Sequence, residues 1–507
     1  WLKSWYVRYF VHSSSMRLSV FRGLPKHMRG FSAARLTVDR LPRHVVEAEY
    51  AVRGAIVIRS GEIDAELKSG KGSYPFSEVV PCNIGNPQAV GQKAITFYRQ
   101  VLSVLCNPGV LETSHGLPED VVARAKMFLG AQNVGAYSHS KGIAVARQEV
   151  ARFIDRRDRV PVPANVEHIF LSNGASDAVK AGLSLLINDP NDAIMVPVPQ
   201  YPLYSAAVRL MNGHFLGYYL EEESGWSTTA AGIKKTIEEF RQKNPQGRVR
   251  ALVVINPGNP TGQLMSLEDM KDVVDLCEQE GIVLLADEVY QDNIWTEKKT
   301  WSSFRKVALE KQSNVELMSF HSVSKGFYGE CGFRGGYVET VNIDAGVLDQ
   351  IYKLASLSLC SNTMGQAMMA LVTNPPSEGD PSFPLYQQER DAIMSSLKRK
   401  AKLVTTRLNA MEGVSCQEVE GAMYAFPKLT LPPKAVEAAA QKGQAPDFMY
   451  CMDMLEQTGV VVVPGSGFEQ VPGTHHYRMT ILPDESKLPG VLDRMEEFHN
   501  SFLKKYA

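Results

Sequence analysis

The chain has few of the features that mark membrane, secreted or nucleic-acid-binding proteins. No run of roughly eighteen apolar residues occurs in its 507 residues, so no transmembrane helix is expected. Its seven cysteines are odd in number and include no CxxC pair, which indicates reduced thiols in a reducing compartment. The formal net charge of -1 predicts neither a nucleic-acid partner nor an acidic membrane surface. These absences favour a globular protein of about two or three domains.

Acidic residues are also absent from Trp1 to Val38, where five arginines alternate with serine and apolar residues. This composition is typical of an organelle transit peptide. We therefore expect residues 1–38 to be a transit peptide or, alternatively, a disordered basic tail. A true start at Met16 would leave residues 1–15 untranslated. The predicted location is the mitochondrial matrix, with the cytoplasm as the alternative.

Short apolar runs alternate with longer amphipathic runs in the middle of the chain. Continuous Val, Ile and Leu runs predict strands buried on both faces, as in a mostly parallel sheet covered by helices. The predicted strands are residues 168–172, 193–197, 214–220, 250–256, 282–287, 315–320 and 335–341. Between two of them, a helix is expected to begin near Ser266 and Asp269 and to end at Gly281. The predicted fold class is α/β, built from βαβ units.

Polar residues follow five of these predicted strands. In open α/β sheets, ligands bind beyond the carboxyl ends of the strands. Residues that could meet there are Asn173 to Ser176, Tyr201, Asn259, Asp287 and Lys325. We expect them to line one cavity.

Several motifs lie in this part of the chain and in the region that follows it. They are SNGAS (172–176), NPGNPTG (256–262), ADEVY (286–290), HSVSKGFYGECGFRGG (321–336), GAMYAFP (421–427) and VVPGSGF (462–468). A lone lysine such as Lys325 is usually a solvated surface charge. Only the motifs taken together indicate a function for it. The chain resembles the fold-type I, class I and II aminotransferases, and more closely the alanine aminotransferases, from about residue 40 to the C-terminus. The motifs agree with those of that family in their order, spacing and context.

The resemblance implies a pyridoxal-5'-phosphate (PLP) enzyme with a fold-type I architecture. A mostly parallel central sheet would be sandwiched by helices, beside a smaller α+β domain. Residues 39–130 would form an N-terminal arm and part of the small domain, 131–384 the large PLP-binding domain, and 385–507 the small C-terminal domain. The proline-rich stretch 373–384 would be a linker or surface loop.

Catalytic roles follow from the same resemblance. Lys325 would bind the PLP aldehyde covalently and then move the substrate Cα proton, which requires an amine that is unprotonated part of the time. Asp287 would pair with the pyridinium nitrogen and keep the ring electron-withdrawing. Tyr290 and Asn259 would hydrogen-bond the cofactor's phenolate oxygen. Alone, Asp287 would be interpreted as a helix cap or turn residue.

The phosphate of PLP needs donors and positive charge. Backbone N–H groups of Ala175 and Ser176 would face it at a helix N-terminus. Ser322, Ser324 and Arg334 would add hydroxyl and guanidinium donors.

Tyr201 resembles the aromatic residue that stacks on the cofactor ring, with Tyr204 as the second candidate for a polar contact. Arg478 would bind the substrate α-carboxylate, assisted by the backbone of Gly85 and by Asn259. Tyr137 looks like the tyrosine that a neighbouring subunit contributes, which implies a homodimer with shared sites; otherwise it is an ordinary turn residue.

No metal site is expected, because the adjacent His475 and His476 lack the spacing of a helical metal pair. The predicted reaction interconverts L-alanine and 2-oxoglutarate with pyruvate and L-glutamate by a ping-pong mechanism. Two alternatives stay open. One is a glutamate–glyoxylate or other small-amino-acid transaminase, and the more distant one is a PLP-dependent lyase on the same fold.

Overall fold

The computed structural model describes residues 36–48, 54–113 and 116–507. The predicted transit peptide therefore lies almost entirely outside the described residues. The chain divides into two compact units, Trp1–Val46 and Glu47–Ala507. The described part of the first unit contains η2 (Val38–Arg40) and α1 (Arg43–Val46). The second unit contains every residue that was predicted for the site.

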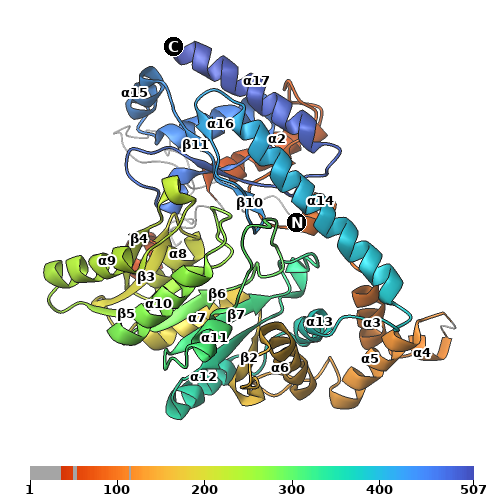
Figure 1. The fold of residues 1–507 in the computed structure, drawn as a ribbon. Helices are drawn as coiled ribbons and strands as arrows, with labels where there is room; N and C mark the ends of the chain where they lie inside the picture. Colours follow the sequence, from red (N-terminus) through yellow and green to blue (C-terminus); the bar gives the residue numbers. More distant parts are fainter. Residues whose placement is uncertain (1–35, 49–53, 114–115) are drawn as a thin grey trace, which may run out of the picture. The chain divides into compact units, whose positions relative to one another are not determined.

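A seven-stranded sheet forms the centre of the second unit (Figure 1), with the strand order β2-β8-β7-β6-β5-β3-β4. The strands are β2 (Ile169–Ser172), β3 (Asp192–Val198), β4 (His214–Tyr219), β5 (Arg248–Ile255), β6 (Val283–Asp287), β7 (Leu317–Ser322) and β8 (Gly336–Val341). Every predicted run forms one of these strands, with ends shifted by at most two residues. Neighbours from β4 to β7 pair in parallel, whereas β8 is antiparallel to both β7 and β2.

Helices cover both faces of the sheet, as the alternation along β5 illustrates. Leu252 and Val254 belong to a core with α9 (Ala230–Lys243), α10 (Leu267–Glu280) and α11 (Phe304–Glu310). Val253 and Ile255 belong to the opposite core, with α7 (Ala175–Leu186), α8 (Pro202–Leu210) and α12 (Ala345–Leu357). Successive side chains of a strand point to opposite faces, so one strand contributes to both cores. The predicted mostly parallel sheet between helices is confirmed.

Helix α10 begins and ends where the sequence predicted. The Ser266 hydroxyl accepts a hydrogen bond from the backbone N–H of Asp269, at 3.1 Å. Gly281 follows the helix with φ of 63°, a left-handed conformation that glycine adopts without steric cost. Local side-chain chemistry therefore accounts for both boundaries of this helix.

A third core lies at the β2 and β8 side of the sheet. Its helices are α3 (Thr96–Cys106), α5 (Glu119–Ala131), α6 (Ala144–Asp158) and α13 (Thr363–Thr373). The predicted proline-rich loop connects α13 to α14 (Phe383–Asn409). Figure 1 shows α14 running from the region of α3 and α13 toward α16 (Pro446–Thr458) and α17 (Leu488–Tyr506).

A fourth core joins segments from the two ends of the second unit, because α2 (Ala55–Lys68) packs with α14, α16 and α17. Short strands pair there as β1 (Val80–Pro81) with β12 (Val460–Val461), and β11 (Lys428–Leu429) with β9 (Val414–Ser415). A small antiparallel sheet has the order β10-β14-β13, with β10 (Tyr424–Ala425), β14 (Tyr477–Thr480) and β13 (Val463–Pro464).

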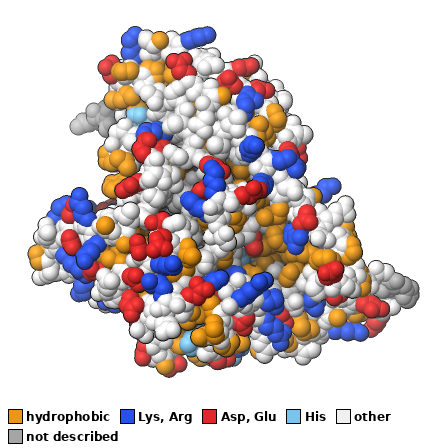
Figure 2. Space-filling model, in the orientation of Figure 1, with side chains coloured by type: hydrophobic (Ala, Val, Ile, Leu, Met, Phe, Trp, Pro, Cys, Tyr) orange, Lys and Arg blue, Asp and Glu red, His pale blue; other side chains and the backbone are white. Residues whose placement is uncertain are grey.

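The remaining elements are short. They are α4 (Val110–Thr113), α15 (Pro433–Gln441), η4 (Pro87–Val90), η5 (Val166–His168), η6 (Glu222–Ser224), η7 (Cys331–Phe333) and η8 (Gly465–Phe468). Across the part of the chain that the structure describes, no helix is both long and apolar enough to span a bilayer. Acidic and basic side chains are interspersed over the face shown in Figure 2.

Candidate active site

Five strands of the central sheet, β2, β3, β5, β6 and β7, lead into one cavity of about 500 Å³. A cavity of this size suits a small organic ligand. Its lining includes Gly85, Ala175, Ser176, Tyr201, Asn259, Asp287, Tyr290, Ser322, Ser324, Lys325, Arg334 and Arg478. Of the residues predicted to meet there, Ala175, Ser176, Tyr201, Asn259, Asp287 and Lys325 line this cavity, whereas Asn173 and Gly174 do not.

Asp287 is the last residue of β6 and its carboxylate is buried. Burial raises the pKa of Asp287 to about 6, although a hydrogen bond from Tyr204 and the positive charge of Lys325 act in the opposite direction. The Tyr204 hydroxyl donates to Asp287 Oδ2 at 2.9 Å. A buried carboxylate with a raised pKa gains most from a cationic partner, so this position suits a protonated ring nitrogen.

Lys325 follows β7 and extends its amine into the cavity. Its Nζ donates to the backbone oxygen of Gly85 at 3.0 Å and lies 5.5 Å from the centroid of the Tyr290 ring. The next residue is held by Asn293, whose Oδ1 accepts from the backbone N–H of Gly326 at 2.9 Å. Asn293 therefore fixes the loop that carries the lysine. No motif singled it out as a site residue.

The N-terminus of α7 forms one end of the cavity. Its first residues are Ala175 and Ser176, and Gly174 before them provides no side-chain cap. Free backbone N–H groups at such a helix end form an anion site. Arg334 lies beside them, because its Nη2 donates to Asn173 O at 2.9 Å and to Ser176 Oγ at 3.4 Å. Gly174 has φ of 85°, which L side chains rarely adopt, and a Cβ there would lie only 2.6 Å from Arg334 Nη2, so this position favours glycine.

Two serines add hydroxyl groups near the lysine. Ser322 ends β7, and its Oγ accepts from the backbone N–H of Ser324 at 3.3 Å. Both serines line the cavity together with Arg334. The helix terminus, the guanidinium and these hydroxyls form a cationic, donor-rich end that suits a phosphate.

Arg478 forms the other end of the cavity, on β14, and is only 1% exposed. Its Nη1 donates to Asn259 Oδ1 at 3.1 Å, and its Nη2 donates to the backbone oxygen of Asn83. Among the described residues its Nε has no hydrogen-bond partner. Buried donors are normally paired, so a buried guanidinium that lines a cavity and has one nitrogen unpaired suits an anionic ligand.

The prediction missed one residue of the lining that contacts several predicted ones. The Tyr290 hydroxyl donates to Tyr424 Oη at 3.0 Å, and the Arg478 guanidinium carbon lies 4.4 Å from the Tyr424 ring centroid. Tyr424 belongs to the GAMYAFP motif, which was noted for its resemblance but given no role. The motif was the available signal. Its meaning required the pairing of β10 with β14.

Tyr137 does not line the cavity and is 77% exposed in the single chain. Its predicted contribution to the site of a neighbouring subunit stays a prediction. Tyr201 does line the cavity, and its ring centroid lies 6.5 Å from that of Tyr204.

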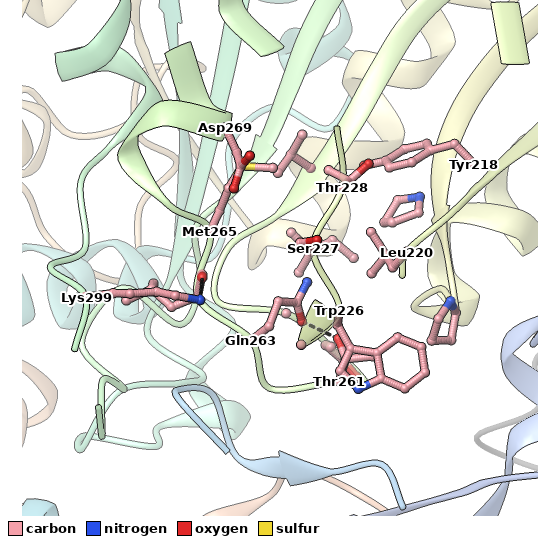
Figure 3. Close-up of a pocket in the computed structure, with 18 residues that line it drawn as sticks. Tyr218, Leu220, Trp226, Ser227, Thr228, Thr261, Gln263, Met265, Asp269 and Lys299 are labelled. Atoms are coloured by element: carbon pink, nitrogen blue, oxygen red, sulfur yellow. Dashed lines mark hydrogen bonds between the residues drawn. The ribbon is translucent and has the colours of Figure 1, made fainter. Parts of the chain in front are cut away.

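A second, much smaller cavity of about 40 Å³ lies next to the first and shares Ile255 and Asn259 with it. Figure 3 shows that its lining is both polar and apolar, and that Thr261 donates a hydrogen bond to Gln263. This volume holds at most a few water molecules. Because neither Lys325 nor Asp287 lines it, we assign the chemistry to the larger cavity.

Comparison with known proteins agrees with this geometry. The profile of the family "Aminotransferase class I and II" matches residues 107–495. Alanine aminotransferase 2, mitochondrial, of Arabidopsis thaliana is 48% identical over 94% of this chain and 89% of its own length. Alanine aminotransferase 1 of Homo sapiens is 46% identical over 94% of this chain and 97% of its own.

A solved structure, the alanine aminotransferase from Pyrococcus furiosus, superposes with a TM-score of 0.71 at 24% identity. The superposition covers 91% of this chain and all of that one, which supports the same fold. The identity of 46–48% to alanine aminotransferases over nearly the whole chain assigns the family within this fold. The chain belongs to the class I and II aminotransferases and, within them, to the alanine aminotransferase family.

Proposed function

We propose that this protein is a PLP-dependent aminotransferase that interconverts L-alanine and 2-oxoglutarate with pyruvate and L-glutamate. The observation that carries the proposal is the single cavity that Lys325, Asp287 and Arg478 line together. The names of relatives that are 46–48% identical support the choice of alanine. The chemistry of the cavity alone would fit other amino donors.

The residues present fit PLP at three places. The α7 N-terminus, Ser322, Ser324 and Arg334 would hold the phosphate. Asp287 would face the ring nitrogen, while Tyr290 and Asn259 would bond the phenolate oxygen and Tyr201 would contact the ring. When bound, PLP supplies the aldehyde that takes up the amino group and the ring that withdraws electrons from the substrate.

Lys325 and Asp287 carry the proton chemistry of the proposal. The Lys325 Nζ moves the proton of the substrate Cα, since it is the amine that projects into the cavity. Asp287 keeps the ring nitrogen protonated by remaining ionised beside it. A cation there offsets the burial that raises the pKa of this carboxyl group.

Arg478 orients the substrate through its α-carboxylate, with Asn259 holding Nη1 and the Gly85 backbone nearby. Alanine, glutamate and their 2-oxo acids all carry this group. One site can therefore bind each pair in turn, as a ping-pong mechanism requires.

We also propose a homodimer in which Tyr137 of one chain completes the site of the other. The support is that Tyr137 is highly exposed in the single chain and lies outside its own cavity. Its hydroxyl could therefore serve a site only if that site belonged to another chain. Mixing chains that carry Tyr137→Phe with chains that carry Lys325→Ala tests it. In a mixed dimer, one site would carry both substitutions and the other neither, so the mixture should regain activity.

The domain division and the location are proposed on separate grounds. The core that joins α2 with α14, α16 and α17 is distinct from the cores of the central sheet, which supports large and small domains near 131–384 and 385–507. The acid-free N-terminal segment and the names of mitochondrial relatives from Arabidopsis thaliana and Dictyostelium discoideum support the mitochondrial matrix.

Product stoichiometry tests the proposed reaction. The purified protein, loaded with PLP, is mixed with L-alanine and 2-oxoglutarate, and pyruvate and L-glutamate are measured over time. We expect equal amounts of both products and no continuous turnover without the 2-oxo acid. Ammonia release with alanine alone would indicate a lyase, and a strong preference for glyoxylate as acceptor would indicate the related transaminase.

A further inference from the structure

Two buried aromatic rings contact the Arg478 guanidinium. Its Cζ lies 4.4 Å from the ring centroid of Tyr424 and 4.9 Å from that of Phe468. Both side chains are almost completely buried. Cation–π contacts are stronger in desolvated surroundings than at an exposed surface. We call Tyr424 and Phe468 the aromatic clamp.

Strand pairing brings the clamp to Arg478. Tyr424 of β10 lies opposite Thr480 of β14, and Arg478 is two residues from Thr480 on the same face. Diagonal neighbours of this kind are within reach of aromatic and long side chains. On the other side of β14, Val463 of β13 lies opposite Arg478, and the chain continues from β13 through η8 to Phe468.

A main-chain hydrogen bond anchors the second ring of the clamp. Phe468 O accepts from the backbone N–H of Gln200 at 2.9 Å. Gln200 directly precedes Tyr201, which lines the cavity. The clamp therefore belongs to the folded framework around the cavity rather than to a free surface loop.

The clamp and two hydrogen bonds together determine the orientation of the guanidinium. Asn259 Oδ1 accepts from Nη1 and Asn83 O accepts from Nη2, whereas Nε has no partner among the described residues. Without the rings, fewer contacts would fix the guanidinium where it lines the cavity. With the rings in place, its orientation toward a carboxylate is kept.

The Tyr424 hydroxyl has a second contact. It accepts the single hydroxyl proton of Tyr290 at 3.0 Å, and a Cβ at Gly85 would overlap it. The titratable groups that face it are Lys325, Arg478, Tyr290 and Cys331. Burial alone would raise the pKa of Tyr424, but the charges of Lys325 and Arg478 and the hydrogen bond from Tyr290 lower it overall. The acceptor role of this hydroxyl rests on its hydrogen bond from Tyr290.

We propose that Tyr424 and Phe468 are positioning residues: their rings hold the Arg478 guanidinium in place for the substrate α-carboxylate, and the Tyr424 hydroxyl competes with the cofactor's phenolate oxygen for the Tyr290 proton. The identity of the ligands rests on the proposed function. The two parts are separable, because Phe468 has a ring without a hydroxyl.

Ring deletion tests the first part. In Tyr424→Leu and Phe468→Leu, we expect KM for L-alanine and for 2-oxoglutarate to rise together by about tenfold, with kcat within about threefold of the unmodified protein. Calorimetry with propionate, a carboxylate that cannot transaminate, should show the same weakening in the PLP-loaded protein. Tyr424→Phe, which keeps the ring, should bind propionate nearly normally.

A matched control removes another buried hydroxyl from the same core. The Tyr450 hydroxyl bonds His499 Nδ1 at 2.9 Å and, among the described residues, has no hydrogen bond to a residue of the site. Tyr450→Phe should leave the KM values and propionate binding unchanged. If Tyr424→Leu melts below the assay temperature, Phe468→Leu still tests the ring contribution.

Hydroxyl deletion tests the second part. In Tyr424→Phe, Tyr290 loses its competing acceptor and can donate fully to the cofactor oxygen, which favours the ionised form of that oxygen. We expect the pH midpoint of the bound-cofactor absorbance to fall by about half a unit. Phe468→Leu should leave this midpoint unchanged.

The outcomes separate this proposal from the proposed function. Unchanged propionate affinity in both leucine variants, or an unchanged midpoint in Tyr424→Phe, would overturn the positioning roles while transamination by the unmodified protein stands. If the unmodified PLP-loaded protein neither binds propionate nor converts alanine, both proposals fall.

Discussion

The two ends of the cavity each carry an arginine, but the two arginines lie in opposite environments. Arg334 is exposed, has a left-handed backbone with φ of 54°, and donates to the backbone oxygens of Cys331 and Asn173. Arg478 is buried between aromatic rings and lies on a short strand. Water screens a charge at the first end and is excluded from the second.

This difference indicates separate tasks. A phosphate that stays bound can share its charge among a helix terminus, hydroxyls and one solvated guanidinium, so no single donor is essential. A substrate that must bind and leave in every cycle depends on one desolvated guanidinium for its orientation. We therefore expect substitutions at the buried end to cost more than substitutions at the exposed end.

The largest effect should come from the lysine between the two ends. Lys325→Ala leaves both arginines in place but removes the amine that moves the Cα proton, so turnover should fall by at least about 10⁴-fold. Retained cofactor, measured by its absorbance after gel filtration, would show that the two ends still bind. Lys442→Ala on an exposed loop is the control. Normal turnover in Lys325→Ala would contradict the assignment.

The buried end is tested next by Arg478→Lys, which keeps the charge but loses the planar fork. We expect kcat/KM for both L-alanine and 2-oxoglutarate to fall by about 100-fold, or about 2.7 kcal/mol. Cofactor affinity should be nearly unchanged. A loss confined to one of the two substrates would argue against a shared α-carboxylate site.

Asp287 makes the stability of the cofactor-free protein depend on pH. Its folded-state pKa is raised from 3.8 to about 6 by burial, so the folded chain holds this proton where the unfolded chain has released it. The stabilising contribution is complete below about pH 4 and is lost as pH rises through 6, which lowers the free energy of unfolding by about 3 kcal/mol.

Thermal melts from pH 4 to 7 measure this effect against Asp287→Asn. The substituted protein should lose less stability over that range than the unmodified protein. Bound PLP should reduce the difference, because a cationic ring nitrogen favours the ionised carboxylate. Identical pH profiles for both cofactor-free proteins would show that Asp287 is not buried in its neutral form.

The smallest effect is expected at the exposed end. Arg334→Gln should weaken PLP binding by only about tenfold, since solvent screens this guanidinium and the α7 terminus remains. KM for L-alanine at saturating PLP should change little. If PLP binding weakened by about 100-fold, which equals the loss of kcat/KM expected in Arg478→Lys, the two ends of the cavity would not differ as we infer.

Sequence predicted the central sheet well because its strands are continuous apolar runs and its polar residues follow them directly. The start of α10 at Ser266 and its end at Gly281 were equally local signals. The direction of β8 was not predictable, because an apolar run does not encode whether its partner is parallel.

The residues of the site also differ in how far the sequence could predict them. Lys325, Asp287 and Asn259 lie next to predicted strands, so their convergence followed from sheet geometry. Tyr424 and Phe468 acquire their contacts with Arg478 only through the pairing of β14 with two very short strands. Such strands give little hydrophobic periodicity, and a tyrosine or phenylalanine there is usually a core residue. The sequence could therefore mark their motifs but not their contacts.

The most direct test of the account is a single-turnover experiment with L-alanine alone. The purified PLP-loaded protein is mixed with an excess of L-alanine, the cofactor spectrum is followed, and the product is identified. The account predicts that bound PLP becomes pyridoxamine phosphate as one equivalent of pyruvate per site is released. A spectrum that stays unchanged with L-alanine but converts with another amino acid would contradict the alanine assignment and keep only the transaminase.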